Sequence, residues 1–89
     1  MAISTAQLKA KALATVTAID KMRSTHQNIT KKLGDDYNSL LALTSEASPE
    51  LVPLLPPKCD FDSFNNELYG TMTFDELAIF CQQLASLLQ

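Results

Sequence analysis

The sequence predicts an all-α protein, a small helical bundle in which two to four shorter helices pack against one long N-terminal helix. Apolar or small residues recur in alternating steps of four and three over the first third of the chain, which is the spacing of one helix face. Only two of the 89 residues are glycine, which is too few for the many tight turns of an all-β fold. This length fits a single domain, assigned to residues 1–89.

The long helix is expected over about residues 5–33. Ser4 followed by Gln7 fits a capping box at its start, and Gly34 fits its end. Its apolar face is formed by Leu8, Ala12, Thr15, Ile19, Met22, His26, Ile29 and Leu33. Residues 24–28 are mostly poor helix formers, so a kink or local unwinding there is an alternative.

The length of this helix suggests self-association. A helix over residues 5–33 would be about 45 Å long at ~1.5 Å per residue. A compact domain of this size is roughly 30 Å across. Either the helix bends near Ser24 or a second copy covers the overhang. We favour the second copy, which predicts a homo-oligomer, with a dimer preferred.

Shorter helices are expected over about residues 36–46, 49–55, 62–69 and 74–88. Asp35 or Asp36 can cap the first of these, and Tyr37, Leu40, Leu41 and Thr44 should face inward. Pro49 suits the first turn of the next helix. The pair Pro56-Pro57 must end it, because proline lacks the backbone N–H and the pair excludes helical geometry.

Their end signals define the last two segments. Asp60 or Asp62 can cap a brief helix that Gly70 closes. Thr73 and Glu76 form a second capping box. The buried stripe of the final helix is expected to be Phe74, Leu77, Ala78, Cys81, Leu84, Ala85 and Leu88. Ile79, Phe80 and Leu87 widen its apolar surface beyond what one neighbouring element covers.

Charge is divided unevenly along the chain. Residues 1–34 contain six basic residues and one acid, a net charge of +5, whereas residues 35–89 contain one lysine and nine acids, a net charge of −8. Two interpretations stay open. The acidic half can fold back on the basic helix, with weak pairing of exposed charges, or the basic helix can meet an acidic partner.

These patterns favour a non-enzymatic protein–protein interaction module, such as an adaptor, a chaperone-like protein or an inhibitory or regulatory subunit, that self-associates through its helices. The candidate interaction surface consists of Lys9, Lys11, Arg23, His26, Lys31, Lys32, Ile79, Phe80 and Leu87. The alternative is a protein that binds a small anionic ligand at the basic turn around Arg23. The basic residues are spread around the helix rather than gathered in a stripe, so neither a nucleic-acid partner nor a membrane surface is expected.

No catalytic, cofactor or metal motif is recognised, so we expect neither an enzyme nor a metal or cofactor site. The single histidine, His26, is interpreted as a partly buried, hydrogen-bonded residue of the helix seam. Cys81 falls on the core stripe, and Cys59 lies in a loop where a reactive thiol is the minor alternative. The absence of a secretory signal or membrane-length apolar run predicts a cytoplasmic protein with reduced thiols.

Overall fold

The computed structural model describes residues 4–88. Its elements are α1 (Thr5–Arg23), β1 (Ile29–Thr30), α2 (Lys31–Ala47), the 3₁₀ helix η1 (Pro49–Leu54), β2 (Phe61–Phe64), β3 (Glu67–Gly70) and α3 (Phe74–Leu87). The three strands within this range form one antiparallel sheet in the order β1-β3-β2. The predicted all-α class is therefore wrong, and the fold is mixed α/β. Residues 1–3 and 89 of the predicted domain lie outside the described residues.

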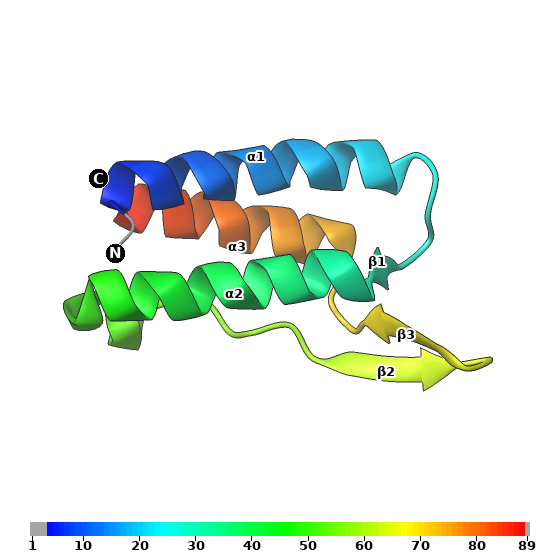
Figure 1. Cartoon of the computed structure of the whole chain (residues 1–89). Helices are drawn as coiled ribbons and strands as arrows, with labels where there is room; N and C mark the ends of the chain where they lie inside the picture. The colour runs from blue at the N-terminus through cyan, green and yellow to red at the C-terminus, as the bar shows by residue number, and fades with distance from the viewer. Residues whose placement is uncertain (1–3, 89) are drawn as a thin grey trace.

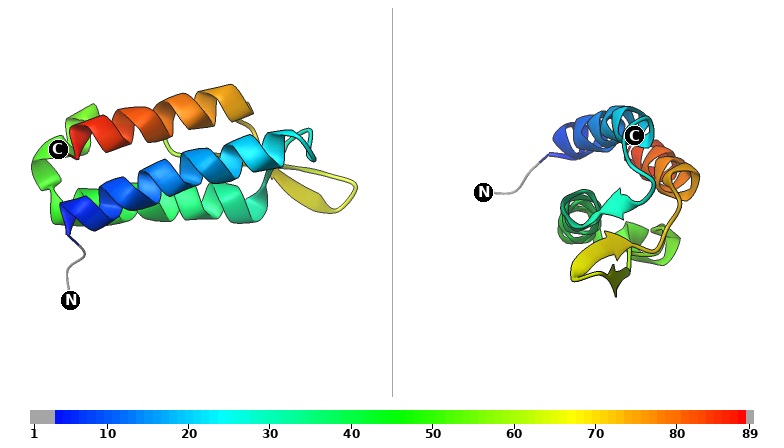
Figure 2. Two further views of the ribbon diagram at one scale, coloured as in Figure 1. Left: turned by 90° about the horizontal axis from the view of Figure 1, so that it is seen from above. Right: turned by 90° about the vertical axis from the view of Figure 1, so that its right-hand side faces the viewer.

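The helices form the body of the molecule, and the sheet closes one end of it (Figure 1). α1 and α3 lie side by side and run in opposite directions, while α2 lies along the other side of the core (Figure 2). The hairpin of β2 and β3 projects from the end where α1 stops and α2 starts. The 3₁₀ helix η1 lies at the opposite end, beyond the last turn of α2 (Figure 1).

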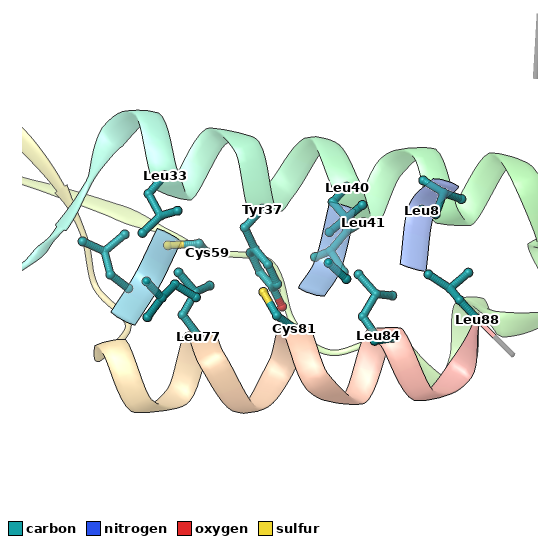
Figure 3. Packing of buried hydrophobic residues seen from close by; sticks show 14 residues of the cluster. Leu8, Leu33, Tyr37, Leu40, Leu41, Cys59, Leu77, Cys81, Leu84 and Leu88 are labelled. Atoms are coloured by element: carbon teal, nitrogen blue, oxygen red, sulfur yellow. The ribbon is translucent and has the colours of Figure 1, made fainter. Parts of the chain in front are cut away.

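The core lies between the three α-helices (Figure 3). Its buried apolar residues are Leu8, Ala12, Ile19, Ile29, Leu33, Tyr37, Leu40, Leu41, Cys59, Leu77, Cys81, Leu84, Ala85 and Leu88. The inward positions predicted for α2, including Thr44, are all buried. On α3 the predicted stripe is confirmed, because its seven residues are buried or packed against the core. These helices therefore follow their local apolar periodicity.

The predicted long helix is broken into two. Within the weak segment, side-chain hydroxyls take the last carbonyls of α1: Ser24 Oγ donates to Lys21 O at 2.8 Å, and Thr25 Oγ1 donates to Met22 O at 3.3 Å. After the break, Thr30 Oγ1 accepts the Leu33 N–H at 3.2 Å and caps α2. The unwinding alternative at residues 24–28 thus describes the chain, because hydroxyl side chains compete with the helical hydrogen bonds.

Three end signals have other roles than those predicted. Gly34 does not end a helix, since it is buried within α2. Asp35 and Asp36 do not cap a helix, because each lies one turn after a lysine inside α2. The segment 62–69 is a β-hairpin rather than a helix, and its first and last residues pair across the two strands.

Asp60 and Asp62 do not cap a helix and Gly70 does not end one, because this segment forms β2 and β3. The signals at the starts of α1 and α3 are confirmed. Both capping boxes form, Ser4 with Gln7 before α1 and Thr73 with Glu76 before α3. In each, the hydroxyl accepts the N–H of the third helical residue while that residue's side chain accepts the cap N–H. The predicted helix at 49–55 is a 3₁₀ helix that ends at Leu54, just before the two prolines.

Candidate functional site

The hairpin is closed by the shortest common type of connection. Asn65 and Asn66 form a two-residue turn in which both residues have positive φ, 53° and 66°. This is the type I′ geometry, whose twist matches that of the flanking strands, and asparagine is among the residues that tolerate it. The turn sets the register, so that Phe64 pairs with Glu67 and Asp62 with Tyr69.

The hairpin is attached to the helices through its inner face. The ring of Phe61 lies so close to Gly34 that a Cβ placed there would be 2.6 Å from its Cε1 atom. The ammonium group of Lys31 lies 5.7 Å from the centroid of the same ring, at the distance of a cation–π contact. β1 adds a second attachment, since Ile29 pairs with Gly70 and Thr30 with Tyr69.

The segment leading into β2 is held by α2. Asn38 bonds the backbone of Cys59 twice: its Nδ2 donates to Cys59 O at 2.9 Å, and its Oδ1 accepts the Cys59 N–H at 2.7 Å. The Tyr37 hydroxyl donates to Pro57 O at 2.7 Å. These bonds satisfy backbone groups in a stretch without regular structure and hold the base of the hairpin against α2.

The tip of the hairpin exposes large apolar side chains. Phe64 is 69% exposed and Leu68 is 46% exposed. Because successive residues of a strand point to opposite faces, the register places Phe64, Glu67 and Tyr69 together on the face away from Phe61. The tip thus presents an aromatic and acidic face to solvent, on strands that are fixed at their base.

Beside this face lies a hollow of about 460 Å³, which we call the hairpin hollow. It is open to solvent and lies between the hairpin and the segment that joins α1 to β1. It is lined by His26, Gln27, Asn28, Ile29, Thr30, Phe64, Glu67, Leu68 and Tyr69. A volume in this range can hold a small molecule or a few side chains of a partner.

The edge of β2 is partly closed to further strands. In a two-residue hairpin the pair next to the turn, here Phe64 and Glu67, exchanges both hydrogen bonds. Bonded and non-bonded pairs alternate along the strands, so the backbone N–H and C=O of Ser63 point away from β3. Its N–H donates to the carboxylate of Asp62 at 2.8 Å. A charged side chain that occupies an outward N–H disfavours pairing with another strand. The exposed face of the hairpin is therefore a better contact surface than its edge.

The predicted basic surface is dispersed and partly neutralised. Arg23 Nη1 lies 2.5 Å from Asp75 Oδ1, and Arg23 Nη2 lies 4.0 Å from Asp20 Oδ1. Lys31 pairs with Asp35 at 2.6 Å, and Lys32 with Asp36 at 3.8 Å. Lys9 is half-buried and Lys11 is exposed on α1, and neither forms an ion pair with another residue of the range 4–88.

His26 lies on the surface rather than in a helix seam. Its side chain is exposed, and its Nδ1 lies 2.8 Å from Thr25 Oγ1. Arg23 points to α3, so the structure does not bring these two residues into one anion site. The hairpin hollow contains His26 but no arginine or lysine among its described lining residues.

The predicted apolar surface of α3 is reduced to one outward residue. Ile79 is 51% exposed, whereas Phe80 is half-buried and packs against the core. Leu87 is also half-buried. Phe80 and Leu87 thus serve the protein's own packing in part, and the helix presents less free apolar surface than predicted.

The sequence pattern does not identify the hairpin residues Phe64, Glu67, Leu68 and Tyr69 as site residues, because the end signals of their segment predict a helix. A local signal does exist, because the adjacent Asn65 and Asn66 are turn formers that tolerate positive φ. A strand of four residues lies on each side of this pair. The exposure of Phe64 has no such signal, since its place in the sequence resembles that of a core residue.

Two other surface features are weaker candidates. Val52 and Leu54 on η1 are 49% and 62% exposed, at the end of the molecule opposite the hairpin. A second hollow of about 340 Å³ lies between α1 and α2 and is lined by Lys11, Ala14, Thr15, Asp36, Ser39, Leu40 and Leu43. It combines one exposed base with one exposed acid and has no aromatic lining residue.

The cysteines are buried and unpaired. Burial raises the pKa of the Cys59 thiol, and it raises the pKa of the Cys81 thiol to about 11, which disfavours the reactive thiolate. Across residues 4–88, no three His, Cys, Asp or Glu side chains are grouped so as to hold a metal ion. Within the same range, no helix is both long and apolar enough to cross a membrane.

Comparisons with models of protein families, with curated protein sequences and with solved structures find no match to this chain.

Proposed function

We propose that this chain is a non-enzymatic protein–protein interaction module that binds its partner with the exposed face of the hairpin and the hairpin hollow. The observation that carries the proposal is the exposure of Phe64 on the outer face of the hairpin and of Leu68 at the rim of the hairpin hollow, on strands that are fixed at their base. Exposed aromatic and aliphatic side chains beside a hollow are typical of binding surfaces, where such residues become buried anchors. An adaptor or a regulatory subunit is consistent with this arrangement.

The proposal also includes a role in self-association and a cytoplasmic location. Ile79 on α3 supports contact between helices of two copies, because it is a large apolar side chain left half-exposed on a helix. The two unpaired, buried thiols support a reducing compartment. The alternative function, binding of a small anion around Arg23, has less support, because two carboxylates already lie beside that guanidinium group.

Site-specific photocrosslinking in the native cell tests the proposed surface. A photoreactive phenylalanine analogue, p-benzoylphenylalanine, replaces Phe64 in one variant and Leu54 in another. Leu54 is a matched control, because it is 62% exposed but lies at the opposite end of the molecule. We expect a discrete crosslinked band from position 64 and none of equal intensity from position 54. Circular dichroism of both variants checks that helical content is retained.

A second substitution tests whether the crosslink reports binding. Adding Leu68→Ser to the variant labelled at position 64 should reduce its crosslink several-fold, because the apolar anchor is removed from an exposed site. Adding Val52→Ser, again at the opposite end, should leave it unchanged. No band from position 64, or a band that is insensitive to Leu68→Ser, would contradict the proposed surface.

A further inference from the structure

We infer that the hairpin hollow accepts a basic side chain, arginine or lysine, presented by an extended apolar segment of a partner protein. This inference rests on the proposed function and specifies the chemistry of the partner. The part of the chain that contains the hairpin is acidic. Residues 59–89 contain five acidic residues and no lysine, arginine or histidine. Two of these acids, Asp62 and Glu67, belong to the hairpin itself.

Glu67 provides the charge inside the hollow. It is the one carboxylate among the described lining residues, it is exposed, and it takes part in none of the ion pairs formed within residues 4–88. Of the same lining residues, only His26 can carry a positive charge. A cation that enters the hollow therefore gains a carboxylate partner and meets no lysine or arginine.

The aromatic lining adds a second attraction for the same group. Phe64 and Tyr69 share the face of the hairpin that carries Glu67. The face of an aromatic ring attracts an ammonium or guanidinium group, and this attraction increases when the group is partly removed from water. Aromatic rings beside a carboxylate thus favour a basic side chain over a neutral or an acidic one.

The basic residues of the chain that flank the hollow in sequence do not compete for Glu67. Arg23 is paired with Asp75, and Lys31 is paired with Asp35 while lying over the Phe61 ring on the opposite face of the hairpin. The opposite wall of the hollow, residues 26–28, supplies side-chain amides from Gln27 and Asn28. Their carbonyl oxygens can accept further hydrogen bonds from a guanidinium group.

The apolar residues at the rim of the hollow indicate which residues should lie next to the basic residue in the partner segment. Leu68 and Phe64 are exposed at the rim, so a segment that places its basic side chain in the hollow also brings its neighbours against apolar surface. The hollow is about 460 Å³, too small for a helix with its side chains and large enough for a few residues. An extended segment with a basic residue next to apolar ones fits both features.

Selection from a phage-displayed library of random heptapeptides tests this inference directly. The full chain is the bait, together with the charge-reversed variant Glu67→Lys. We expect peptides enriched on the wild type to share an arginine or lysine beside apolar residues, and peptides enriched on Glu67→Lys to lose that preference in favour of aspartate or glutamate. Enrichment of acidic or uncharged peptides on the wild type would overturn the inference.

A synthetic copy of the peptide most enriched on the wild type then locates and measures the contact. Its addition to ¹⁵N-labelled protein should shift the backbone amides of residues 26–30 and 64–69. Glu67→Gln should weaken its affinity roughly 10-fold, because a hydrogen-bonded charge pair is lost at a partly desolvated site. Glu50→Gln is the matched control, since it removes an exposed acid at the opposite end and should leave the affinity unchanged.

The outcomes separate this inference from the proposed function. Shifts at the hairpin with equal affinity for wild type and Glu67→Gln would reject the basic side chain but keep the hairpin as a binding surface. Shifts confined to other surfaces, together with no crosslink from position 64, would reject both. A crosslinked species that contains two copies of this chain and nothing else would reject a separate basic partner and show that the hairpin mediates self-association.

Discussion

Gly34 and Gly70 are needed for close approach between segments rather than for turning the chain. Neither has a positive φ. A Cβ at Gly70 would lie 2.9 Å from Cys59 Sγ and 2.9 Å from Ile29 Cγ2, and one at Gly34 would meet the Phe61 ring. The two glycines thus bring α2, β1 and the hairpin together around the buried Cys59 side chain. The position of the hairpin depends on the absence of two side chains.

Because of Tyr37 and Cys81, the stability of the fold should decrease at alkaline pH. Both are buried, and burial raises the pKa of Cys81 from 9.0 to about 11 and raises the pKa of Tyr37 well above its ordinary value of 10.0. Each group therefore holds its proton more tightly in the folded than in the unfolded state. Stability is fully present below about pH 9 and is lost as the pH rises toward the folded-state pKa values.

Urea titrations at about pH 7, 9 and 10.5 measure this effect. We expect the free energy of unfolding to be similar at the two lower values, and then to fall by up to about 1.4 kcal/mol per pH unit for each group. Cys81→Ala should flatten the part of the slope just above pH 9, although Cys59 remains. A stability that is unchanged between pH 7 and 10.5 would contradict the protonated state of these groups in the fold.

The break between α1 and α2 shows how a pairing between distant segments overrides a local pattern. The apolar period continues through the break, and Ile29 and Leu33 are both buried as that period requires. However, Ile29 reaches the core from a strand that pairs with Gly70, about forty residues later. Ending the helix at these hydroxyl residues costs little stability, because their helix propensity is low.

The end and the core of α3 should contribute differently to stability. Thr73→Ala removes the side-chain cap, which accepts the Glu76 N–H at 3.1 Å, and should cost about 1 kcal/mol. Leu77→Ala and Leu84→Ala remove fully buried side chains and should each cost roughly 2–5 kcal/mol, enough to unfold much of a domain this small. Urea unfolding monitored by circular dichroism compares them. If the cap variant were less stable than both core variants, Leu77 and Leu84 would not be the core-facing residues of α3.

The shape of the whole molecule changes the argument for self-association. α1 has 19 residues and is therefore about 28 Å long, whereas the molecule extends 39 Å along its longest axis. The helix does not overhang its own domain, so the length argument no longer supports a second copy. What remains is the half-exposed Ile79 on α3, the half-exposed Leu13 on α1 and the apolar residues at the two ends of the molecule.

Light scattering over a wide range of micromolar concentrations tests self-association through α3. We expect a mass above 9.8 kDa that falls toward this value on dilution. Ile79→Glu should shift the equilibrium toward the monomer, because a charge would be buried at the contact. Ala42→Glu, an exposed substitution on α2, should not. A mass of 9.8 kDa at every concentration would contradict self-association.

The charge division along the chain has a mixed explanation in three dimensions. Within residues 4–88, one ion pair joins the basic and the acidic parts across the fold, Arg23 with Asp75, while the pairs of Lys31 and Lys32 are local to α2. Exposed pairs of this kind contribute little to stability. Internal pairing thus accounts for part of the division, and the acidic hairpin end is left facing solvent.

The residues by themselves determined those features that depend on a helix's own periodicity and ends. The inward faces of α2 and α3, both capping boxes and the stop before Pro56 follow from interactions within a few residues of each other. Such short-range signals do not require knowledge of the rest of the chain.

Tertiary structure alone decided the sheet and therefore the candidate site. A two-residue strand such as β1 has no stability of its own and exists because β3 supplies its hydrogen bonds. The turn at Asn65 and Asn66 is readable locally, but the exposure of Phe64 is not, because an aromatic residue in a short strand is usually buried. Whether such a residue joins the core or faces a partner depends on which element packs over it, and that contact is formed by segments far apart in the chain.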